Sequence, residues 1–400
     1  MKIVMTTPIL YDPTSPFNHL LKDMLNGWLA DGHEIVRIVA CESAADTGYT
    51  MGILSDALTY IRVKRKKKNK GHIFQRYLAD MLTNIRMAWK MRHIKDADIL
   101  FEDVSYSSFW SVRMAKKKHM RVISMLQDVW PDNAVQSGLI APQSLMYRYF
   151  EYWQKYVYRR SDTIICISED MKAFIQSKGV VGKKIEVIYN WGYSDKPVHI
   201  AWDDNRFVQK YALEKNVFYA VYAGNIGRMQ NVEVVVRAAE ELRDHPALHF
   251  LIVGGGVRRD AVAQMIEEKG LDNVTLLPLQ PSGLAADIYA AASVNLIPLV
   301  PGGVKTALPS KTGVILSCGQ PVVVCVDPQS GFARMIETSG AGIAVGPDDY
   351  KTLAKTIVGL AKKQTIRRED VHACFQHHFS RRRNVQRYSA VMKKQGETQT

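Results

Sequence analysis

The sequence predicts an α/β protein of two Rossmann-like domains, each a doubly wound parallel sheet, that face each other across a cleft. Its 400 residues suit two domains of roughly 100–200 residues each. Short apolar runs alternate with amphipathic stretches along the chain, which is the pattern of βαβ units in a parallel sheet. This pattern occurs twice over similar lengths, and several apolar runs in the second half end in glycine.

The first half is predicted to form one domain over residues 1–195. Its expected strands are KIVMTTPI, GHEIVRIVA, ADILFED, RVISMLQD and DTIICIS. Residues 19–29 carry apolar side chains at helical spacing between the first two strands. Ligands of such sheets bind outside the carboxyl ends of the strands. Residues 6–8, 102–103 and those from Asp128 onward are therefore the candidates for a site in this domain.

The second half is predicted to form a domain over residues 202–375, after a linker near residues 192–201. Its expected strands are FYAVYAG, HFLIVGGG, NVTLLPL, SVNLIPL and PVVVCVD, with helices between them. Residues 379–394 read as a basic amphipathic helix beyond this second array.

Composition restricts the possible partners and the compartment. The net charge of +14 favours anionic partners: a membrane surface, nucleic acid or a phosphorylated substrate. The basic residues are spread out and form no known nucleic-acid module, so we expect no nucleic acid. Five widely spaced cysteines without a CxxC pair suit a reducing compartment. The first residues read as a strand, and no run of 18 apolar residues appears, so any membrane attachment is expected to be peripheral.

The turn Gly224-Asn225-Ile226-Gly227-Arg228 is the first candidate for chemistry. It follows a strand and precedes a helix, where free backbone N–H groups favour an anion. Arg228 adds a full positive charge, so a diphosphate is the expected ligand. The alternative is an ordinary βα turn that uses glycine only for tightness.

Gly254 and Gly255 follow the next strand with the same pattern. They are predicted to contact the ligand directly, and the alternative is that glycine only permits close packing between helix and strand.

A third candidate is Pro309-Ser310-Lys311-Thr312, which opens a predicted helix before the strand PVVVCV. Serine and threonine suit helix caps, and lysine is a strong phosphate donor. We expect Lys311 and Arg228 to neutralise a leaving diphosphate, against the alternative of a capped helix with a solvated lysine.

Among the carboxylates, Asp128 in LQDVWPD is predicted to face a donor sugar or an acceptor hydroxyl, or else to cap its loop. Glu102 and Asp103 are predicted to cap a helix. Asp96 and Asp98 have D-x-D spacing but precede a strand, so we interpret them as a turn, and no metal is expected.

Two further segments are rich in basic residues. Residues 146–160, MYRYFEYWQKYVYRR, interleave aromatic and basic residues, as at a membrane interface or in an interior helix with solvated tips. The block of lysines and an arginine at 64–70 fits either anionic lipid or a solvated loop.

Taken together, the motifs and their order resemble the family 4 retaining glycosyltransferases of the GT-B architecture, in particular their bacterial capsule and O-antigen branch. The likeness spans most of the chain. It rests on GHEIVRIVA, LQDVWPD, RRSDTIICISEDMKAFI, IEVIYNW, YAGNIGRMQNVEVVVRAA, LIVGGG, NVTLLPLQP, IYAAASVNLIPL and ALPSKTGVILSCGQPVVV.

The resemblance implies an enzyme that transfers a hexosyl or N-acetylhexosaminyl group from a nucleotide-sugar, with a UDP-sugar most expected and no further cofactor. It implies catalytic roles for Arg228, Lys311 and Asp128. It also implies a lipid-linked saccharide acceptor, a cytoplasmic location on the inner face of the membrane, front-face attack with retention, and a C-terminal helix that crosses back to the first domain.

There are two departures from the family pattern. Thr306 and Val314 stand where the family often has two glutamates, the second of which is expected to hold the nucleotide ribose. The residues PILYDPTSPF replace a glycine pair in the first loop. The departures keep two alternatives open: a non-catalytic partner subunit, and a GT-B sugar-nucleotide epimerase, which would need acid and base side chains in the cleft.

Overall fold

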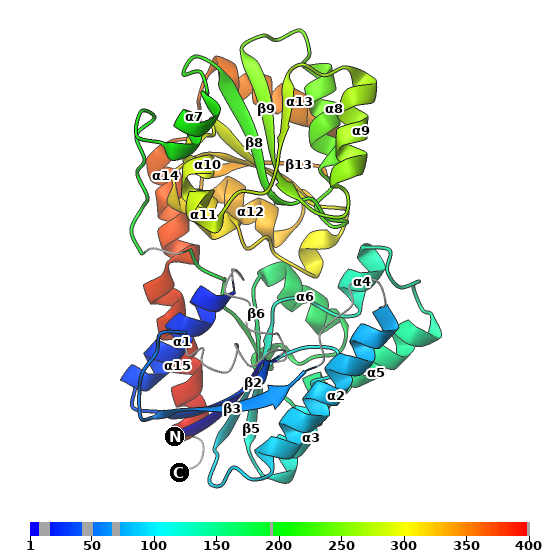
Figure 1. Cartoon of the computed structure of the whole chain (residues 1–400), viewed down its shortest axis with the longest axis vertical. Helices are drawn as coiled ribbons and strands as arrows, with labels where there is room; N and C mark the ends of the chain where they lie inside the picture. The colour runs from blue at the N-terminus through cyan, green and yellow to red at the C-terminus, as the bar shows by residue number, and fades with distance from the viewer. Residues whose placement is uncertain (8–16, 42–50, 66–72, 193–194, 398–400) are drawn as a thin grey trace.

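The computed structural model contains two parallel-sheet domains stacked along the long axis (Figure 1). It describes residues 1–7, 17–41, 51–65, 73–192 and 195–397. Most of the first-loop departure, residues 8–16, and most of the lysine block, residues 66–70, lie outside the described residues.

The N-terminal sheet has the strand order β3-β2-β1-β4-β5-β6-β7, with all described pairings parallel. Its strands are β1 (Lys2–Thr7), β2 (Glu34–Cys41), β3 (Leu58–Lys64), β4 (Ile99–Asp103), β5 (Arg121–Leu126), β6 (Thr163–Cys166) and β7 (Ile185–Val187). Its helices are α1 (Asn18–Ala30), α2 (Ile73–Met91), α3 (Phe109–Lys117), α4 (Asp132–Gln136), α5 (Leu145–Arg160) and α6 (Glu169–Ser177).

The C-terminal sheet has the order β10-β9-β8-β11-β12-β13, again with parallel pairing. Its strands are β8 (Phe218–Asn225), β9 (Leu248–Gly255), β10 (Val274–Leu277), β11 (Val294–Pro298), β12 (Val322–Cys325) and β13 (Gly342–Val345). The helices that follow β7 are α7 (Arg206–Tyr211), α8 (Glu233–Glu241), α9 (Arg259–Lys269), α10 (Ala285–Ala291), α11 (Thr312–Ser317), α12 (Gly331–Thr338), α13 (Tyr350–Lys362), α14 (Arg368–Cys374), the π-helix η5 (Phe375–Phe379) and α15 (Arg381–Glu397).

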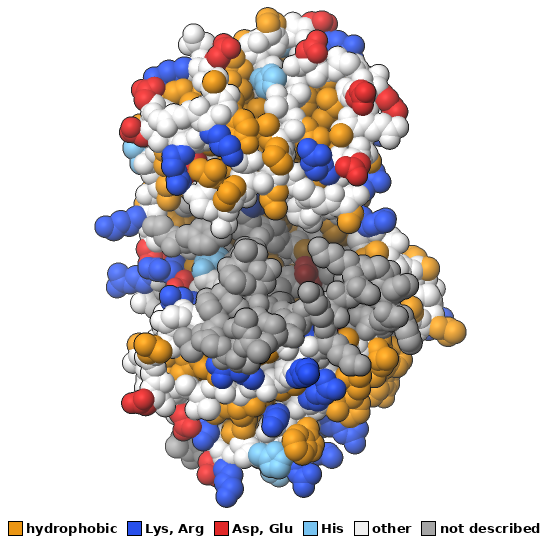
Figure 2. Space-filling view, viewed as in Figure 1, with side chains coloured by type: hydrophobic (Ala, Val, Ile, Leu, Met, Phe, Trp, Pro, Cys, Tyr) orange, Lys and Arg blue, Asp and Glu red, His pale blue; other side chains and the backbone are white. Residues whose placement is uncertain are grey.

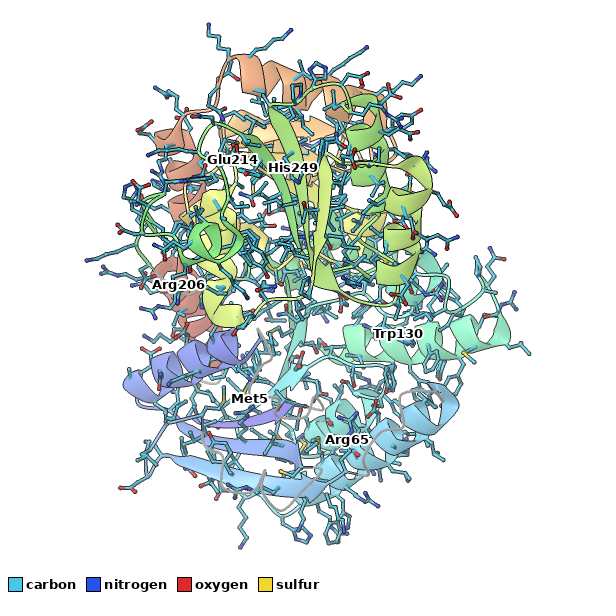
Figure 3. The ribbon with its side chains drawn as sticks, turned by 45° about the horizontal axis from the view of Figure 1, so that its top comes forward. Met5, Arg65, Trp130, Arg206, Glu214 and His249 are labelled. Carbon is cyan, nitrogen blue, oxygen red and sulfur yellow. The ribbon has the colours of Figure 1, made fainter. Side chains whose placement is uncertain are left out.

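Each sheet is buried on both faces, which explains why its strands read as continuous apolar runs. In β1, Ile3 and Met5 pack under α1 and α15, whereas Val4 packs on the side of α2, α3 and α5. The period of two along a strand produces this division. Figure 3 places Met5 and Arg65 within the N-terminal domain and Trp130 near the boundary between the domains.

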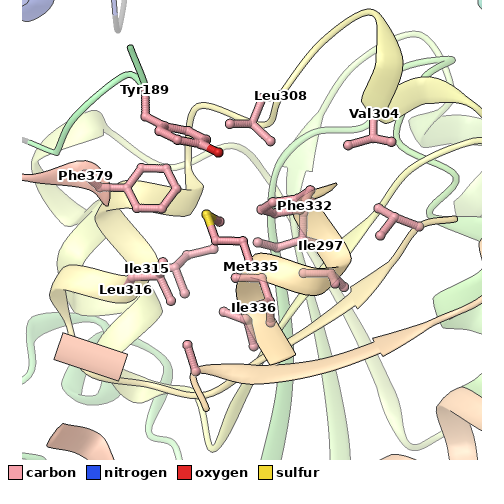
Figure 4. Close-up of a cluster of buried hydrophobic side chains, with 14 of the residues drawn as sticks. Tyr189, Ile297, Val304, Leu308, Ile315, Leu316, Phe332, Met335, Ile336 and Phe379 are labelled. Atoms are coloured by element: carbon pink, nitrogen blue, oxygen red, sulfur yellow. The ribbon is translucent and has the colours of Figure 1, made fainter. Parts of the chain in front are cut away.

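A continuous apolar cluster joins the two domains. Tyr189 of the N-terminal domain and Phe379 of η5 lie beside Leu308 and Phe332 of the C-terminal domain (Figure 4). The Asp170 carboxylate of α6 also accepts the N–H groups of Gly331 and Phe332 at the start of α12, at 2.7 and 2.8 Å. A carboxylate at a helix N-terminus is a stabilising arrangement, here formed across the domain boundary.

Helix α15 returns to the N-terminal domain and packs along α1 (Figure 1). Tyr388 and Met392 are buried in the same cluster as Met5. Lys393 forms an ion pair with Asp31 at 2.8 Å. The core of the N-terminal domain therefore includes side chains from the opposite end of the sequence.

Across the residues that the structure describes, no helix combines the length and the apolar character needed to cross a membrane.

Candidate active site

Lys311 lies against the glycine turn that follows β8. Its Nζ donates a hydrogen bond to the carbonyl of Ala223 at 3.0 Å and sits 3.8 Å from the centre of the Tyr222 ring. Gly224 has φ of +141°, and a Cβ built there would lie 3.5 Å from this Nζ. The structure therefore brings together two of the segments that the sequence singled out.

Burial lowers the pKa of Lys311 to about 7, because protein atoms replace the water that would solvate its ammonium. Among the described residues, its ammonium contacts a carbonyl dipole and an aromatic face and forms no ion pair with a carboxylate. An anion at the turn would restore the preference for the charged form. The arrangement is suited to binding a phosphate group.

Gly254 and Gly255 have different roles in the structure. The N–H of Ile226 donates to the Gly255 carbonyl at 2.8 Å, which ties the two turns together. A Cβ on Gly254 would lie 2.0 Å from the Gly224 carbonyl oxygen, whereas a Cβ on Gly255 would make an ordinary contact of 3.7 Å with Leu279. Glycine at 254 thus has a packing reason, and at 255 it leaves open backbone beside the turn.

Arg228 is the last residue of the glycine turn. Its side chain is exposed, and no hydrogen bond or ion pair joins it to another described residue. Helix α8 begins at Glu233, so the free N–H groups of its first turn lie beyond the glycine turn. The turn itself, including Asn225 and Gly227, precedes the helix by several residues.

The start of α11 is not capped by a serine or threonine side chain, in contrast to the pattern expected for this segment. Lys311 is the residue that precedes α11, and neither Ser310 nor Thr312 caps the helix with its side chain. The Thr312 hydroxyl instead donates to the Pro309 carbonyl at 2.7 Å, while Ser310 is exposed. The expectation of a serine or threonine cap was wrong, because the hydroxyl of Thr312 closes the preceding turn.

Asp128 approaches this segment from the N-terminal domain. It forms an antiparallel β-bridge with Ala307, and the next residue, Val129, donates its N–H to the Thr306 carbonyl at 2.9 Å. The side chain remains open to solvent, yet the protein around it raises its pKa to about 6. The Asp128 carboxylate is therefore reachable from solvent and lies beside the segment that leads to Lys311.

Glu102 and Asp103 cap no helix, so the prediction for them was wrong. They are the last residues of β4 and are buried, since this strand is central in the sheet. Burial raises the pKa of Glu102 to about 8 and that of Asp103 to about 7; the nearby Asp128 raises the latter further, while Arg37 lowers it. The Thr6 hydroxyl donates to Glu102.

One side chain of this region was not identified from the sequence, and the surroundings of a second were not anticipated. Tyr222 supplies the ring beneath Lys311, and its hydroxyl donates to the Asn225 carbonyl at 2.5 Å. The only feature of the sequence that could have indicated Tyr222 is its position two residues before the glycine turn. Asp103 was named from the sequence as a helix cap, whereas in the structure it lies close enough to Asp128 for the charge of Asp128 to raise the pKa of Asp103.

Thr306 and Val314 occupy the positions of the absent carboxylates. Thr306 is buried, and its hydroxyl donates to the Gln136 side chain, whose amide donates to the Gly302 carbonyl at 2.8 Å. Val314 packs against the apolar cluster that joins the domains. Both positions therefore serve packing, and Thr306 forms a contact between the domains.

Of the remaining predictions, Asp96 and Asp98 lie in a turn, with Asp98 accepting the Lys2 N–H at 2.7 Å, as expected. Within the basic block, Arg65 is buried and paired with Asp80, so it belongs neither to a solvated loop nor to a lipid-facing one.

Two family models match successive parts of the chain. The model described as Glycosyltransferase Family 4 covers residues 18–191, and the model described as Glycosyl transferases group 1 covers residues 218–363.

Two curated relatives and two solved structures are similar over long stretches. A probable glycosyltransferase WbjE of Pseudomonas aeruginosa is 23% identical over 78% of each chain. A putative colanic acid biosynthesis glycosyl transferase WcaI of Escherichia coli is 29% identical over 52% of each chain. The structure of sucrose-phosphate synthase from Thermosynechococcus elongatus has a TM-score of 0.77 at 15% identity and covers 99% of each chain. That of Anabaena Alr3699/HepE in complex with UDP has a TM-score of 0.73 at 14% identity, covering 98% of this chain and all of that one.

The two matched regions follow the two sheets, and this arrangement of two parallel-sheet domains is the GT-B architecture. The chain therefore combines a Glycosyltransferase Family 4 domain with a Glycosyl transferases group 1 domain.

Proposed function

We propose that the protein transfers a hexosyl or N-acetylhexosaminyl group from a UDP-sugar, with retention of configuration, to a lipid-linked saccharide during cell-surface polysaccharide synthesis. The observation that carries the proposal is the position of Lys311 on the glycine turn, four residues after Ala307, which pairs with Asp128 of the opposite domain. A phosphate-binding cation and a cleft carboxylate thus converge at the domain boundary.

The names of similar proteins support the substrate classes. HepE has been crystallised with UDP and with UDP-glucose, WcaI is named for colanic acid biosynthesis, and WaaG for lipopolysaccharide biosynthesis. These are properties of those proteins, and they make UDP-sugars and lipid-linked saccharides the first compounds to test here.

In the proposed reaction, the bond between the anomeric carbon and the diphosphate oxygen breaks while Lys311 and the backbone of the turn stabilise the charge that develops on the leaving group. Preorganised donors of this kind act electrostatically, in a site from which domain closure excludes water. The acceptor hydroxyl attacks from the same face, and a phosphate oxygen of the donor takes its proton. Asp128 orients the sugar or the acceptor hydroxyl, Arg228 swings from solvent onto the diphosphate, and no metal takes part.

The absence of carboxylates at Thr306 and Val314 favours a second candidate, a non-catalytic partner subunit with the same fold. In that case Thr306 would serve only the contact between the domains, and the chain would need another protein to transfer the sugar.

The test is a thermal-shift screen against UDP, GDP, dTDP, ADP and their common sugar conjugates. A ligand that binds only the folded protein raises its melting temperature with concentration. We expect a shift with UDP compounds that is lost in Lys311→Ala and reduced in Arg228→Ala. Lys305→Ala is the matched control, because this lysine is exposed and lies in the same segment. If no nucleotide raises the melting temperature at millimolar concentration, the transferase proposal is replaced by the hypothesis of a non-catalytic partner subunit.

A further inference from the structure

One face of the N-terminal domain exposes an unusual number of large apolar side chains. Twelve such side chains are exposed among the described residues, and eight of them lie on α2 or between α4 and the middle of α5. We call this surface the α2–α5 face, and its members are Leu78, Leu82, Trp89, Leu139, Leu145, Met146, Tyr149 and Tyr152.

Helical spacing explains why these side chains share a face. On α2, Leu82 follows Leu78 by four residues and Trp89 follows Leu82 by seven, which are one and two turns. Leu145, Tyr149 and Tyr152 recur on α5 at intervals of four and three. Each helix thus presents an apolar stripe outward in addition to the stripe that it buries.

The two stripes form one surface. The Tyr77 hydroxyl of α2 donates to the Tyr149 hydroxyl of α5 at 3.2 Å, and the Tyr77 and Phe150 rings lie 5.0 Å apart. Figure 2 shows hydrophobic side chains gathered on the right flank of the lower domain, where Figure 1 places α2 and α5. Exposed apolar patches of this extent mark sites of interaction.

Positive charge borders the same face. Its exposed basic residues are Arg86, Lys90, Arg92, Arg148, Arg159 and Arg160. The described acids on the two helices are already engaged: Asp80 is buried and paired with Arg65, and Glu151 pairs with Lys155 at 3.3 Å. The face is therefore apolar in the middle and positive at its edge.

From this combination we infer that the α2–α5 face docks on an anionic lipid bilayer. Apolar side chains enter the boundary between headgroups and acyl chains, while lysine and arginine pair with anionic headgroups. A second copy of the chain fits less well, because a symmetric contact through this face would oppose one positive rim to another.

The face also leads to the candidate active site. Ring centroids connect Tyr77 to Tyr106 at 5.3 Å and Tyr106 to Trp130 at 5.5 Å, and Trp130 is two residues beyond Asp128. A lipid-linked acceptor held in the docked bilayer would reach Asp128 along this aromatic edge. This last step rests on the proposed function, whereas the docking itself does not.

Vesicle flotation tests the docking. We expect the wild-type protein to float with vesicles that contain phosphatidylglycerol, less in high salt, and not with pure phosphatidylcholine. Leu82→Glu/Leu145→Glu should bind roughly tenfold less, because it places charge in the centre of the face. The matched control is Leu54→Glu/Val181→Glu, since these side chains are 89% and 55% exposed and lie elsewhere on the domain.

Three results would overturn the inference: no flotation of the wild type, equal flotation of the two double variants, or a dimer in sedimentation that only Leu82→Glu/Leu145→Glu dissociates. The thermal shift with UDP separates these results from the proposed function. A variant that loses flotation but keeps the nucleotide shift is folded and supports the docking face. A wild-type protein that floats without any nucleotide shift retains the face and loses the proposed donor.

Discussion

The two sheets are both parallel, but the side chains at their carboxyl edges differ: acids predominate at one edge, and glycines and a lysine lie at the other. In the N-terminal sheet this edge holds the acids Glu102, Asp103 and Asp128, all with raised pKa. In the C-terminal sheet it holds glycine turns and Lys311, whose pKa is lowered. Parallel sheets place ligands at this edge in either case, so the residues after the strands, and not the fold, determine which ligand each domain favours.

Removal of the Lys311 side chain has the largest expected effect. We expect Lys311→Ala to lower the transfer rate roughly 10²–10³-fold, the range observed when one preorganised donor is removed from a charge-stabilising site. The measurement is turnover of a UDP-sugar found in the thermal-shift screen. A loss of the same size in the control Lys305→Ala would show that the effect is not specific to the turn.

The pH dependence of nucleotide binding, compared between the wild type and Lys311→Arg, tests whether Lys311 is the group that titrates. A bound diphosphate would favour the charged lysine, so we expect the pKa of Lys311 to rise from about 7 on binding. Above pH 7, binding therefore takes up a proton, and affinity falls by up to about tenfold per pH unit. Arginine stays charged throughout this range, so Lys311→Arg should bind with little dependence on pH. If that variant keeps the wild-type dependence, another group titrates.

The glycine turns allow a matched pair of substitutions. Gly254→Ala should destabilise the C-terminal domain by about 1–3 kcal/mol, because its Cβ would overlap the Gly224 carbonyl. Gly255→Ala adds a Cβ at ordinary contact distance from Leu279 and should cost much less. Chemical denaturation of both variants measures the difference, and equal costs would contradict the packing role of Gly254.

The smallest expected effect concerns the acidic edge. Because the pKa of Glu102 is raised to about 8 in the folded state, its carboxyl keeps its proton on folding while the unfolded chain ionises near pH 4.5. The wild type should therefore lose stability relative to Glu102→Gln as pH rises from about 5 to 8, by at least about 1 kcal/mol. Denaturation curves at several pH values test this, with the exposed Glu241→Gln as control. A constant difference across this range would contradict the raised pKa.

The two sheets and their site could be predicted to different extents. Alternating apolar runs indicated both sheets because strands buried on two faces leave a continuous pattern. The meeting of Lys311 with the Gly224 turn was predictable, since both follow strands of one parallel sheet. The roles of Gly254 and Glu102 were not predictable, because each depends on an atom of a neighbouring strand: the Gly224 carbonyl and the Thr6 hydroxyl.

Two further details were hidden for the same reason. Arg65 continues a basic run in the sequence, yet it is buried because Asp80 on α2 pairs with it. In the basic-aromatic segment at 146–160, Phe150 and Tyr158 are buried, whereas Tyr149 and Tyr152 are exposed. Periodicity alone could not distinguish the buried face of this helix from its exposed face, since aromatic residues lie on both faces.

The return of α15 to the N-terminal core has a consequence for synthesis on the ribosome. Domains usually fold in the order in which they emerge, the N-terminal one first. Here Tyr388 and Met392 share a core with Met5, so the first domain lacks part of its interior until the second has been translated. The C-terminal domain is therefore able to fold while the N-terminal domain is still incomplete, and a ribosome that stalls before α15 leaves an unfinished first domain joined to a finished second one.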